Sequence, residues 1–250
     1  MGYIIAIAGK GGTGKTTIAS LIIRVIKEQR LGSVLAVDAD PNSNLAQVLG
    51  IEEKATIGDI VDEIAASPEK IPQGMAKDTF IEFQLQTAIS ESEGFDLLAM
   101  GRPEGAGCYC YVNNVLRNIV GKLINNYDYI VIDNEAGLEH LSRRTTRSAD
   151  VLVIISDATV VGLKAAKRIK VLSEELKINI KKNLLIVNRL DKEIEKEKIK
   201  DLDFNYIAKI PDDPEIFKIS LNGSSIMSLK QDSISLNALR KIGDKIWRKN

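Results

Sequence analysis

The chain has 250 residues, 44% of them hydrophobic and 27% charged, and its 34 lysines and arginines balance 34 aspartates and glutamates. This composition is typical of a globular protein with enough chain for a large core, and it excludes an intrinsically disordered chain. A net charge of zero argues against a broad nucleic-acid-binding surface, which needs an excess of basic residues.

Short apolar runs alternate with stretches of helical periodicity along the chain. The predicted strands are residues 3–8, 33–38, 95–100, 129–133, 151–156, 183–188 and 205–210. The predicted helices are residues 14–29, 46–49, 57–66, 112–125, 138–148, 160–176, 192–201 and 235–247. Almost wholly apolar strands that alternate with helices are typical of a parallel sheet covered on both faces. We therefore expect an α/β fold: one doubly wound domain over residues 1–250, with a mostly parallel sheet of about seven strands. Residues 51–94, where prolines and a glycine interrupt weak patterns, could form an inserted subregion.

The first predicted strand runs into a phosphate-binding loop. Residues 9–16 read GKGGTGKT and fit the P-loop pattern G-x-x-x-x-G-K-[ST] between a strand and a helix. Such glycines let successive backbone N–H groups point at one anion at the positive end of a helix. Lys15 is expected to reach the β- and γ-phosphates, and the Thr16 hydroxyl to bind Mg²⁺. The nucleotide-binding residues predicted here are Gly11, Gly12, Thr13, Gly14, Lys15, Thr16 and Thr17.

The second residue of this loop, Lys10, carries a resemblance to a known class. The form GKGGTGKT resembles the deviant Walker A motif of the ParA, MinD and nitrogenase-iron-protein class of nucleotide-dependent dimers. In that class the extra lysine reaches the partner's nucleotide across the dimer interface. The resemblance therefore implies an ATP-bound homodimer with Lys10 in the catalytic machinery. From its position alone, Lys10 could also be a solvated loop lysine.

Acidic residues follow two of the predicted strands, at the strand ends where such folds bind ligands. Asp38 and Asp40, within VDADPNSN, resemble the class's switch I, and Asp133, within IDNEAG, resembles its switch II. The resemblance implies that Asp40 orients or deprotonates the attacking water. It also implies that Asp38 and Asp133 act on Mg²⁺ through its bound waters, and that Gly137 presents its N–H to the γ-phosphate. As an alternative, carboxylates at strand ends can be plain helix caps.

Two interpretations of the base-binding residues remain open. As a strand-end asparagine, Asn188 would hydrogen-bond adenine, as in the class that the chain resembles. As part of an N-[KR]-x-D motif, Asp191 could accept hydrogen bonds from guanine, although Arg189 stands where lysine is usual. The later Pro211 and Asp212 resemble the loop that packs along adenine in the same class. ATP is therefore the expected nucleotide.

The two cysteines, Cys108 and Cys110, stand one residue apart among glycines and tyrosines. Two thiols supply two ligands, and a closed tetrahedral site needs four, which a two-fold dimer would complete. Soft thiolate ligands suit Ni²⁺ or Zn²⁺. The alternatives are a pair of buried structural cysteines, a disulfide, which this spacing disfavours, and a redox dithiol, which usually takes C-x-x-C spacing.

Together, the deviant Walker A motif, the Asp133 switch, the following LEHLSRR and the G-C-x-C loop resemble the CooC-type ATPases over most of the chain, from residue 4 to about residue 214. That family inserts nickel into carbon monoxide dehydrogenase, and close relatives serve acetyl-CoA synthase. The resemblance implies a homodimer promoted by nucleotide or metal, and such a nickel enzyme as client. Asn134 and Glu135 depart from the family's switch II and could alter the hydrolysis rate. The single histidine, His140, is expected on a helix surface or interface rather than as a metal ligand.

Two other functions are weighed against nickel delivery. A MinD- or ParA-like positioning switch would act on a membrane or protein surface. Residues 236–249 form a basic amphipathic pattern that could lie on anionic lipid, although such a helix more often covers a sheet. An iron–sulfur scaffold would need cysteine spacings that are absent. No apolar run approaches the roughly 20 residues of a membrane span and no basic leader is visible, so we expect a cytoplasmic protein without nucleic-acid or membrane partners.

Overall fold

The computed structural model describes residues 2–42, 44–52, 54–102, 114, 115, 118, 121–123, 125–135 and 148–247. The strands are β1 (Tyr3–Gly9), β2 (Val34–Ala39), β3 (Ser90–Ser92), β4 (Phe95–Ala99), β5 (Tyr129–Asn134), β6 (Ser148–Ser156), β7 (Asn179–Asn188) and β8 (Tyr206–Ile210). The helices are α1 (Lys15–Glu28), α2 (Leu45–Leu49), α3 (Ile57–Ala66), α4 (Lys77–Thr87), α7 (Val160–Glu175), α8 (Lys196–Ile199), α9 (Pro214–Leu221) and α10 (Ile234–Ile246), with short 3-10 helices η1 (Pro68–Lys70) and η2 (Ile226–Ser228).

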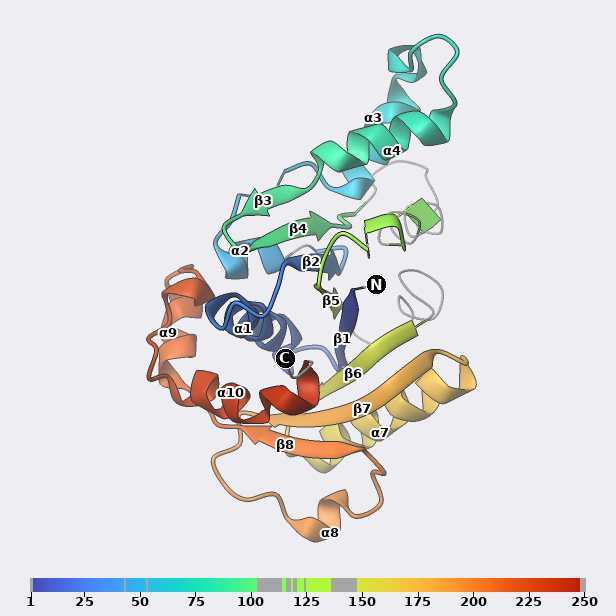
Figure 1. Cartoon of the computed structure of the whole chain (residues 1–250). Helices are drawn as coiled ribbons and strands as arrows, with labels where there is room; N and C mark the ends of the chain where they lie inside the picture. Colours follow the sequence, from blue (N-terminus) through green and yellow to red (C-terminus); the bar gives the residue numbers. More distant parts are fainter. Residues whose placement is uncertain are drawn as a thin grey trace.

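The described strands form one sheet in the order β3-β4-β2-β5-β1-β6-β7-β8 (Figure 1). Neighbouring strands are parallel, except that β3 runs antiparallel to β4. The predicted α/β fold with a mostly parallel sheet is confirmed. The predicted number of about seven strands is one short, because β3 is a three-residue edge strand of sequence Ser-Glu-Ser without any apolar run.

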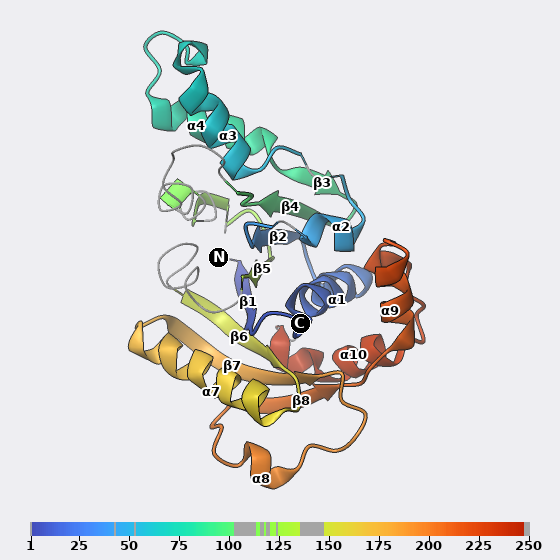
Figure 2. The same cartoon turned by 180° about the vertical axis from the view of Figure 1, so that it is seen from behind.

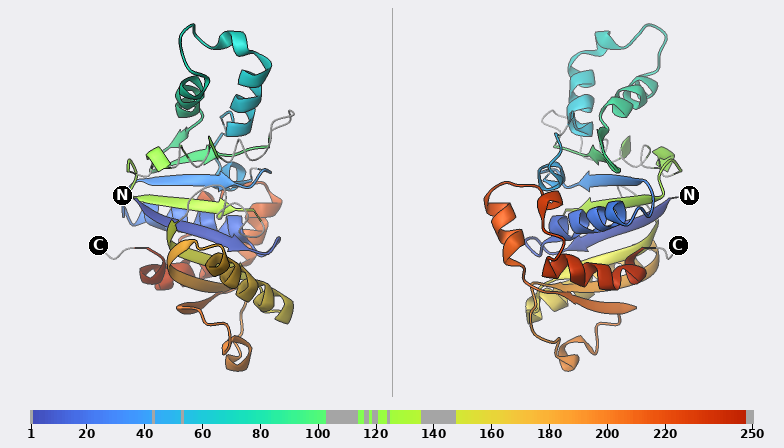
Figure 3. Two further views of the ribbon diagram at one scale, coloured as in Figure 1. Left: turned by 90° about the vertical axis from the view of Figure 1, so that its right-hand side faces the viewer. Right: turned by 60° about the vertical axis from the view of Figure 1, so that its left-hand side comes forward.

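The sheet is covered on both faces, as its apolar strands require. On one face, β1 side chains such as Ile5 and Ile7 pack with α1, α2, η2 and α10. On the other face, Ile4 and Ala6 pack with α3, α4 and α7. Figure 3 shows α1 and α10 in front of the sheet in one view and α7 in front in the other, and Figure 2 shows the arrangement from behind. Two hydrophobic cores therefore hold the central strands between them.

Some helices differ from the prediction. The sequence patterns missed α4 and α9, and only four residues of the predicted helix at 192–201 are helical, as α8. α4 follows a segment interrupted by prolines, and its exposed Phe83 blurs the apolar stripe made by Phe80, Ile81 and Leu85. The predicted helix at 138–148 falls almost wholly outside the described residues, and Ser148 itself begins β6 rather than ending a helix. Half of the predicted helix at 112–125 also lies outside them, and its described residues 114, 115, 118 and 121–123 are helical.

The basic amphipathic pattern near the C-terminus is α10, whose apolar face is buried. Leu236, Leu239 and Ile246 have no exposed surface and pack in the core on the α1 face of the sheet. The interpretation that this helix covers the sheet is confirmed, so its apolar side is not available to lie on lipid. Within the described ranges, no helix combines the length and apolar character needed to cross a bilayer.

The parallel strand order places the sequence motifs together. Gly9, Asp38, Asp133 and Asn188 all stand at or near the carboxyl ends of their strands. Because β2 and β5 are neighbours in register, Asp38 lies directly beside Asp133. Ligands of open α/β sheets bind along this carboxyl edge. The fold therefore brings four separately predicted motifs to one edge of the sheet.

Candidate nucleotide-binding and hydrolysis site

The loop between β1 and α1 is built for close approach of backbone to an anion. Gly14, the N-cap of α1, has φ 91° and ψ 29°, a left-handed conformation that favours glycine. A Cβ there would also stand 2.5 Å from Nδ2 of Asn188. No side chain caps α1 and no acidic residue lies in its first turn, so its N-terminal N–H groups stay available to an anion. Lys10, Gly11 and Gly12 are exposed.

One hydroxyl group, of Thr13, and one ammonium group, of Lys15, lie inside this loop. The Thr13 hydroxyl donates to the carbonyl of Lys10 at 2.8 Å and thereby holds the turn closed. Lys15 is only 9% exposed, and its ammonium contacts the same carbonyl at 3.5 Å, a long and weak hydrogen bond. An ammonium held so loosely has most of its donors free for a phosphate. The arrangement fits the predicted contact of Lys15 with the β- and γ-phosphates.

The two strand-end aspartates have different surroundings. Asp38 has no exposed surface, and its carboxylate accepts from the backbone N–H of Asp40 at 3.0 Å and of Leu45 at 2.8 Å. Leu45 is the first residue of α2, so Asp38 accepts a hydrogen bond from the start of a helix. This contact agrees in part with the alternative that Asp38 is a helix cap. Asp38 therefore holds the segment after β2 against the sheet. Any action on Mg²⁺ would come in addition to that contact.

Asp133 keeps one oxygen free for another ligand. It is 2% exposed, the nearby Thr16 hydroxyl lowers the pKa of its carboxyl group, and its Oδ1 has no hydrogen-bond partner within the described part of the chain. A buried carboxylate oxygen without a partner is costly unless a ligand satisfies it. Mg²⁺ prefers oxygen ligands and usually keeps several waters. The Thr16 hydroxyl and the free oxygen of Asp133 therefore fit the predicted magnesium site.

Burial shifts both carboxyl groups toward their protonated forms. Burial in the sheet, and beyond it the neighbouring Asp133 and Asp40, raises the pKa of Asp38 to about 7. Burial raises the pKa of Asp133 to about 6, against the lowering effects of Thr16 and Lys15. Crowded acidic groups of this kind cannot all ionise at low cost without a cation.

This shift predicts a pH effect on stability. Because the pKa of Asp133 is higher in the folded chain than in the unfolded one, the folded state binds more protons between about pH 4 and 6, and the free energy of unfolding falls as pH rises. Asp133→Asn removes this contribution. We measure the free energy of unfolding in urea, without nucleotide or metal, for both proteins. As pH rises from 4.5 to 7, the free energy of unfolding of the variant should increase by about 1–2 kcal/mol relative to that of the wild type. A stability difference that does not change with pH would contradict the proposed titration.

Asp40 lies at the mouth of the site, half-buried, after the end of β2. Its Oδ1 accepts from the backbone N–H of Asn42 at 2.9 Å and from the Asn42 amide at 3.0 Å. One carboxylate oxygen thus shapes the loop, while the other has the lone pairs that the predicted role toward the attacking water requires.

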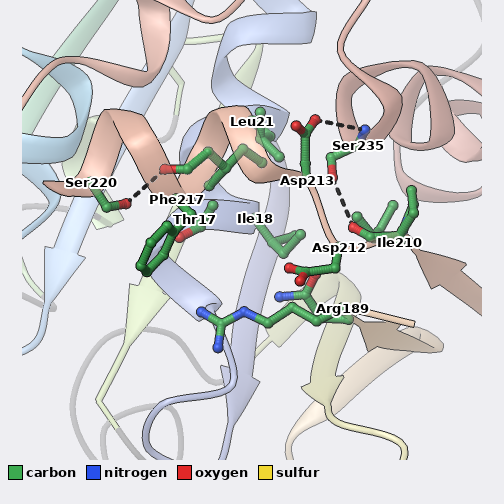
Figure 4. A pocket seen from close by; sticks show the side chains of 13 residues that line it. Thr17, Ile18, Leu21, Arg189, Ile210, Asp212, Asp213, Phe217, Ser220 and Ser235 are labelled. Atoms are coloured by element: carbon green, nitrogen blue, oxygen red, sulfur yellow. Dashed lines mark hydrogen bonds between the residues drawn. The ribbon is translucent and has the colours of Figure 1, made fainter. Parts of the chain in front are cut away.

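A cavity of about 330 Å³ adjoins the phosphate loop, formed between α1, the ends of β7 and β8, α9 and the start of α10 (Figure 4). This is at the lower end of the range for ligand pockets, roughly 300–1,000 Å³, and suits a base more than a whole nucleotide. The lining residues are Thr17, Ile18, Leu21, Asn188, Arg189, Ile210, Pro211, Asp212, Asp213, Ile216, Phe217, Ser220 and Ser235.

The lining of the cavity fits one of the two base-binding interpretations better than the other, and the choice of base stays a prediction. Asn188, Pro211 and Asp212 line it, as predicted for an adenine site, whereas Asp191 does not. Instead, the Asp191 carboxylate accepts from the backbone N–H of Asp212 at 3.1 Å and holds the loop from its other side. Asn188 donates through Nδ2 to the carbonyl of Thr13 at 2.9 Å and so joins the base cavity to the phosphate loop.

The sequence analysis missed several lining residues. Ile18 and Leu21 belong to the buried stripe of α1, whose pattern predicts only core packing. The contribution of α9 was missed with the helix itself. The sequence Asp213-Pro214 is a signal for the start of this helix, because Asp213 caps it and Pro214 occupies its first turn.

Four of the residues singled out from the sequence lie outside the described residues: Cys108, Cys110, Gly137 and His140. Among the residues that the structure does describe, no cluster of three or more histidine, cysteine, aspartate or glutamate side chains could hold a metal ion. The cysteine site remains a prediction of the sequence.

Comparisons with known proteins agree with this geometry. Residues 2–186 match the model of a family described as AAA domain. An uncharacterized ATP-binding protein of Methanocaldococcus jannaschii is 43% identical, over 98% of this chain and 99% of its own. The carbon monoxide dehydrogenase accessory protein CooC of Rhodospirillum rubrum is 30% identical, over 90% of this chain and 89% of its own. The structure of the septum site-determining protein MinD of Pyrococcus horikoshii, complexed with Mg-ADP, superposes with a TM-score of 0.73 and 26% identity, over 99% of this chain and 97% of that one.

Proposed function

We propose that this chain is a cytoplasmic metallochaperone. The premise is that it belongs to the AAA domain family and is a P-loop ATPase of the MinD/ParA class. Residues 1–250 would act as one ATPase domain. Two copies of the chain would bind one nickel ion between their Cys108 and Cys110 pairs. ATP binding and hydrolysis would then drive delivery of the metal to a nickel enzyme such as carbon monoxide dehydrogenase or acetyl-CoA synthase.

The observation that carries the metal part of this proposal is the C-x-C pair in a chain that is 30% identical to CooC. Two thiolates on each copy complete a four-sulfur site only in a dimer, which suits Ni²⁺ in square-planar or Zn²⁺ in tetrahedral geometry. The exposed Lys10 supports the same assembly, because an exposed loop lysine beside the nucleotide is free to reach a partner's phosphates.

The ATPase part follows from the described residues. Bound Mg²⁺ would neutralise charge on the phosphates, held through the Thr16 hydroxyl and the waters near Asp133 and Asp38. Lys15 would stabilise the charge that develops on the transferred phosphoryl group. Asp40 would orient the attacking water, and Asn188, Pro211 and Asp212 would position the base. Most of the rate enhancement would then come from positioning and charge stabilisation.

Anaerobic titration of the reduced protein with Ni²⁺, with and without MgATP, tests the metal site. We expect one tightly bound ion for every two chains, and loss of that binding in the double variant Cys108→Ala/Cys110→Ala. Tyr111→Phe, next to Cys110 in the sequence, keeps both thiols and serves as the matched control. Binding that survives removal of both thiols, or that is absent in the wild type with every nucleotide, would overturn nickel delivery.

A second candidate is an ATP-dependent positioning switch, favoured by the likeness to MinD over almost the whole chain. Such a switch would bind a surface in its ATP state and leave it after hydrolysis. The buried apolar face of α10 means that another part of the chain would have to make this contact. Nucleotide-dependent sedimentation with anionic liposomes would favour the switch, and thiol-dependent nickel binding without sedimentation would favour the metallochaperone.

A further inference from the structure

One aromatic side chain of the base cavity stands open to solvent. Phe217 lines the cavity, yet it is 65% exposed. It belongs to α9, none of whose residues is buried. Figure 4 shows its ring extending from α9 toward the part of the cavity where Thr17 and Arg189 also lie. Covering such an exposed aromatic face with a ligand is favourable, because it removes apolar surface from water.

The backbone position of Phe217 is set by a hydrogen-bond network around Asp213. Asp213 is 6% exposed; its Oδ1 accepts from the N–H of Glu215 at 3.0 Å and so caps α9. Its Oδ2 accepts from the Ser233 hydroxyl at 2.6 Å and from the N–H of Ser235 at 3.2 Å. The Ser235 hydroxyl in turn donates to the carbonyl of Pro211 at 3.0 Å. The start of α9 is thereby tied to α10 and to the loop that lines the cavity.

The backbone that carries Phe217 is therefore fixed before any ligand arrives. The backbone N–H of Phe217 donates to the Asp213 carbonyl at 3.3 Å, which continues the capped first turn of α9. Only the side-chain torsions of the ring are left to be ordered when it makes a contact, which limits the entropy cost of that contact. The cavity lining also includes Ile18 and Leu21 of α1, which are buried, and the half-buried Ile216 of α9, so part of the wall is apolar.

We propose that the ring of Phe217 stacks on the base of the bound nucleotide and closes the solvent side of the cavity. The inference rests on the ATPase function, and it adds a base contact that no sequence motif indicated. Stacking on an aromatic ring depends on the π-face, which every base has. Phe217 therefore adds affinity for nucleotides in general, and the selection of adenine falls to the polar groups of Asn188 and the loop of Pro211.

Two variants of α9 test the contact. Phe217→Ala removes the ring, whereas Leu221→Ala truncates a 70% exposed side chain one turn later that does not line the cavity. Binding of MgADP and MgGDP and inhibition by magnesium tripolyphosphate, which lacks a base, are measured with the wild type and both variants. Stacking contacts of this kind typically change affinity by about tenfold when removed.

For Phe217→Ala, we expect MgADP and MgGDP to bind about tenfold more weakly, with a similar factor for the two nucleotides. Inhibition by magnesium tripolyphosphate should be unchanged. KM for ATP should rise by the same factor while kcat stays within about twofold, and Phe217→Tyr should restore both. Leu221→Ala should match the wild type. Equal behaviour of the two alanine variants, or an equal loss for tripolyphosphate, would overturn the stacking role. If the wild type binds tripolyphosphate but no nucleotide, the base cavity is wrong; if it binds neither, the ATPase function fails as well.

Discussion

Replacing Lys15 with alanine is expected to lower kcat for ATP hydrolysis by about a thousandfold or more. Lys15 is the buried cation of the phosphate loop, 9% exposed, and its ammonium makes a 3.5 Å contact with the Lys10 carbonyl and interacts electrostatically with Asp133. Donors preorganised for the charge that develops in the transition state typically contribute 10²–10³-fold each, and here the donor also carries a full charge. Phosphate release with saturating MgATP measures the effect.

Lys27→Ala is the matched control, because it removes a lysine from the opposite end of the same helix. There the ammonium lies 3.7 Å from Glu93 and over the ring of Phe95, far from the carboxyl edge of the sheet. The control should hydrolyse ATP like the wild type. A Lys15→Ala variant with more than about a tenth of wild-type kcat would show that the phosphate loop acts without its lysine.

The second large effect is expected from Asp40→Asn. A carboxylate that positions or deprotonates the attacking water typically contributes 10²–10⁴-fold, so kcat should fall by at least about a hundredfold. KM for ATP should change little, because the neutral variant keeps an oxygen that can accept from the N–H of Asn42. Single-turnover hydrolysis beside MgADP binding separates the chemical step from nucleotide affinity.

The loop around Asp40 offers its own control. Asn42→Ala removes the 3.0 Å amide contact to Asp40 but leaves the carboxylate in place, so it should cost far less activity than Asp40→Asn. Similar losses in the two variants would mean that loop shape, rather than the carboxylate, limits hydrolysis. Activity close to wild type in Asp40→Asn would assign the water-orienting role to another group.

The sequence alone was enough for the parts of the fold that depend on local patterns. The apolar runs of the central strands and the glycine-rich loop before Lys15 are local signals, and the structure confirms the strands and places the loop as expected. The edge strand β3 and the helix α9 were not predictable in this way. β3 is polar and pairs through its backbone, so it has no apolar pattern. α9 has Ile216 and Ile219 packed against the core, but the exposed Phe217 and Leu221 blur the apolar stripe of this short helix.

The details of the site depend on contacts between distant residues, which no local pattern encodes. That Asp38 holds Leu45 could not be inferred from spacing, and neither could the contact between Asp191 and the backbone of Asp212. The motif around Asn188 left adenine and guanine both open, and the contact that takes Asp191 out of the cavity lining favours adenine. The proposed base contact of Phe217 could not be predicted either, because it depends on the hydrogen bonds that join the start of α9 to α10.

The route of the chain through the site also bears on how the protein is synthesised. The phosphate loop is made early, within the first strand and helix, whereas Pro211, Asp213 and Ser235 of the base cavity follow only after β7 and β8. A nascent chain on the ribosome therefore carries the residues of the phosphate loop long before β5 and β6, which pair with β1, and longer still before the residues that enclose a base. Because the base cavity is complete only once α9 and α10 have docked, a nucleotide bound there stabilises the finished fold in preference to its precursors.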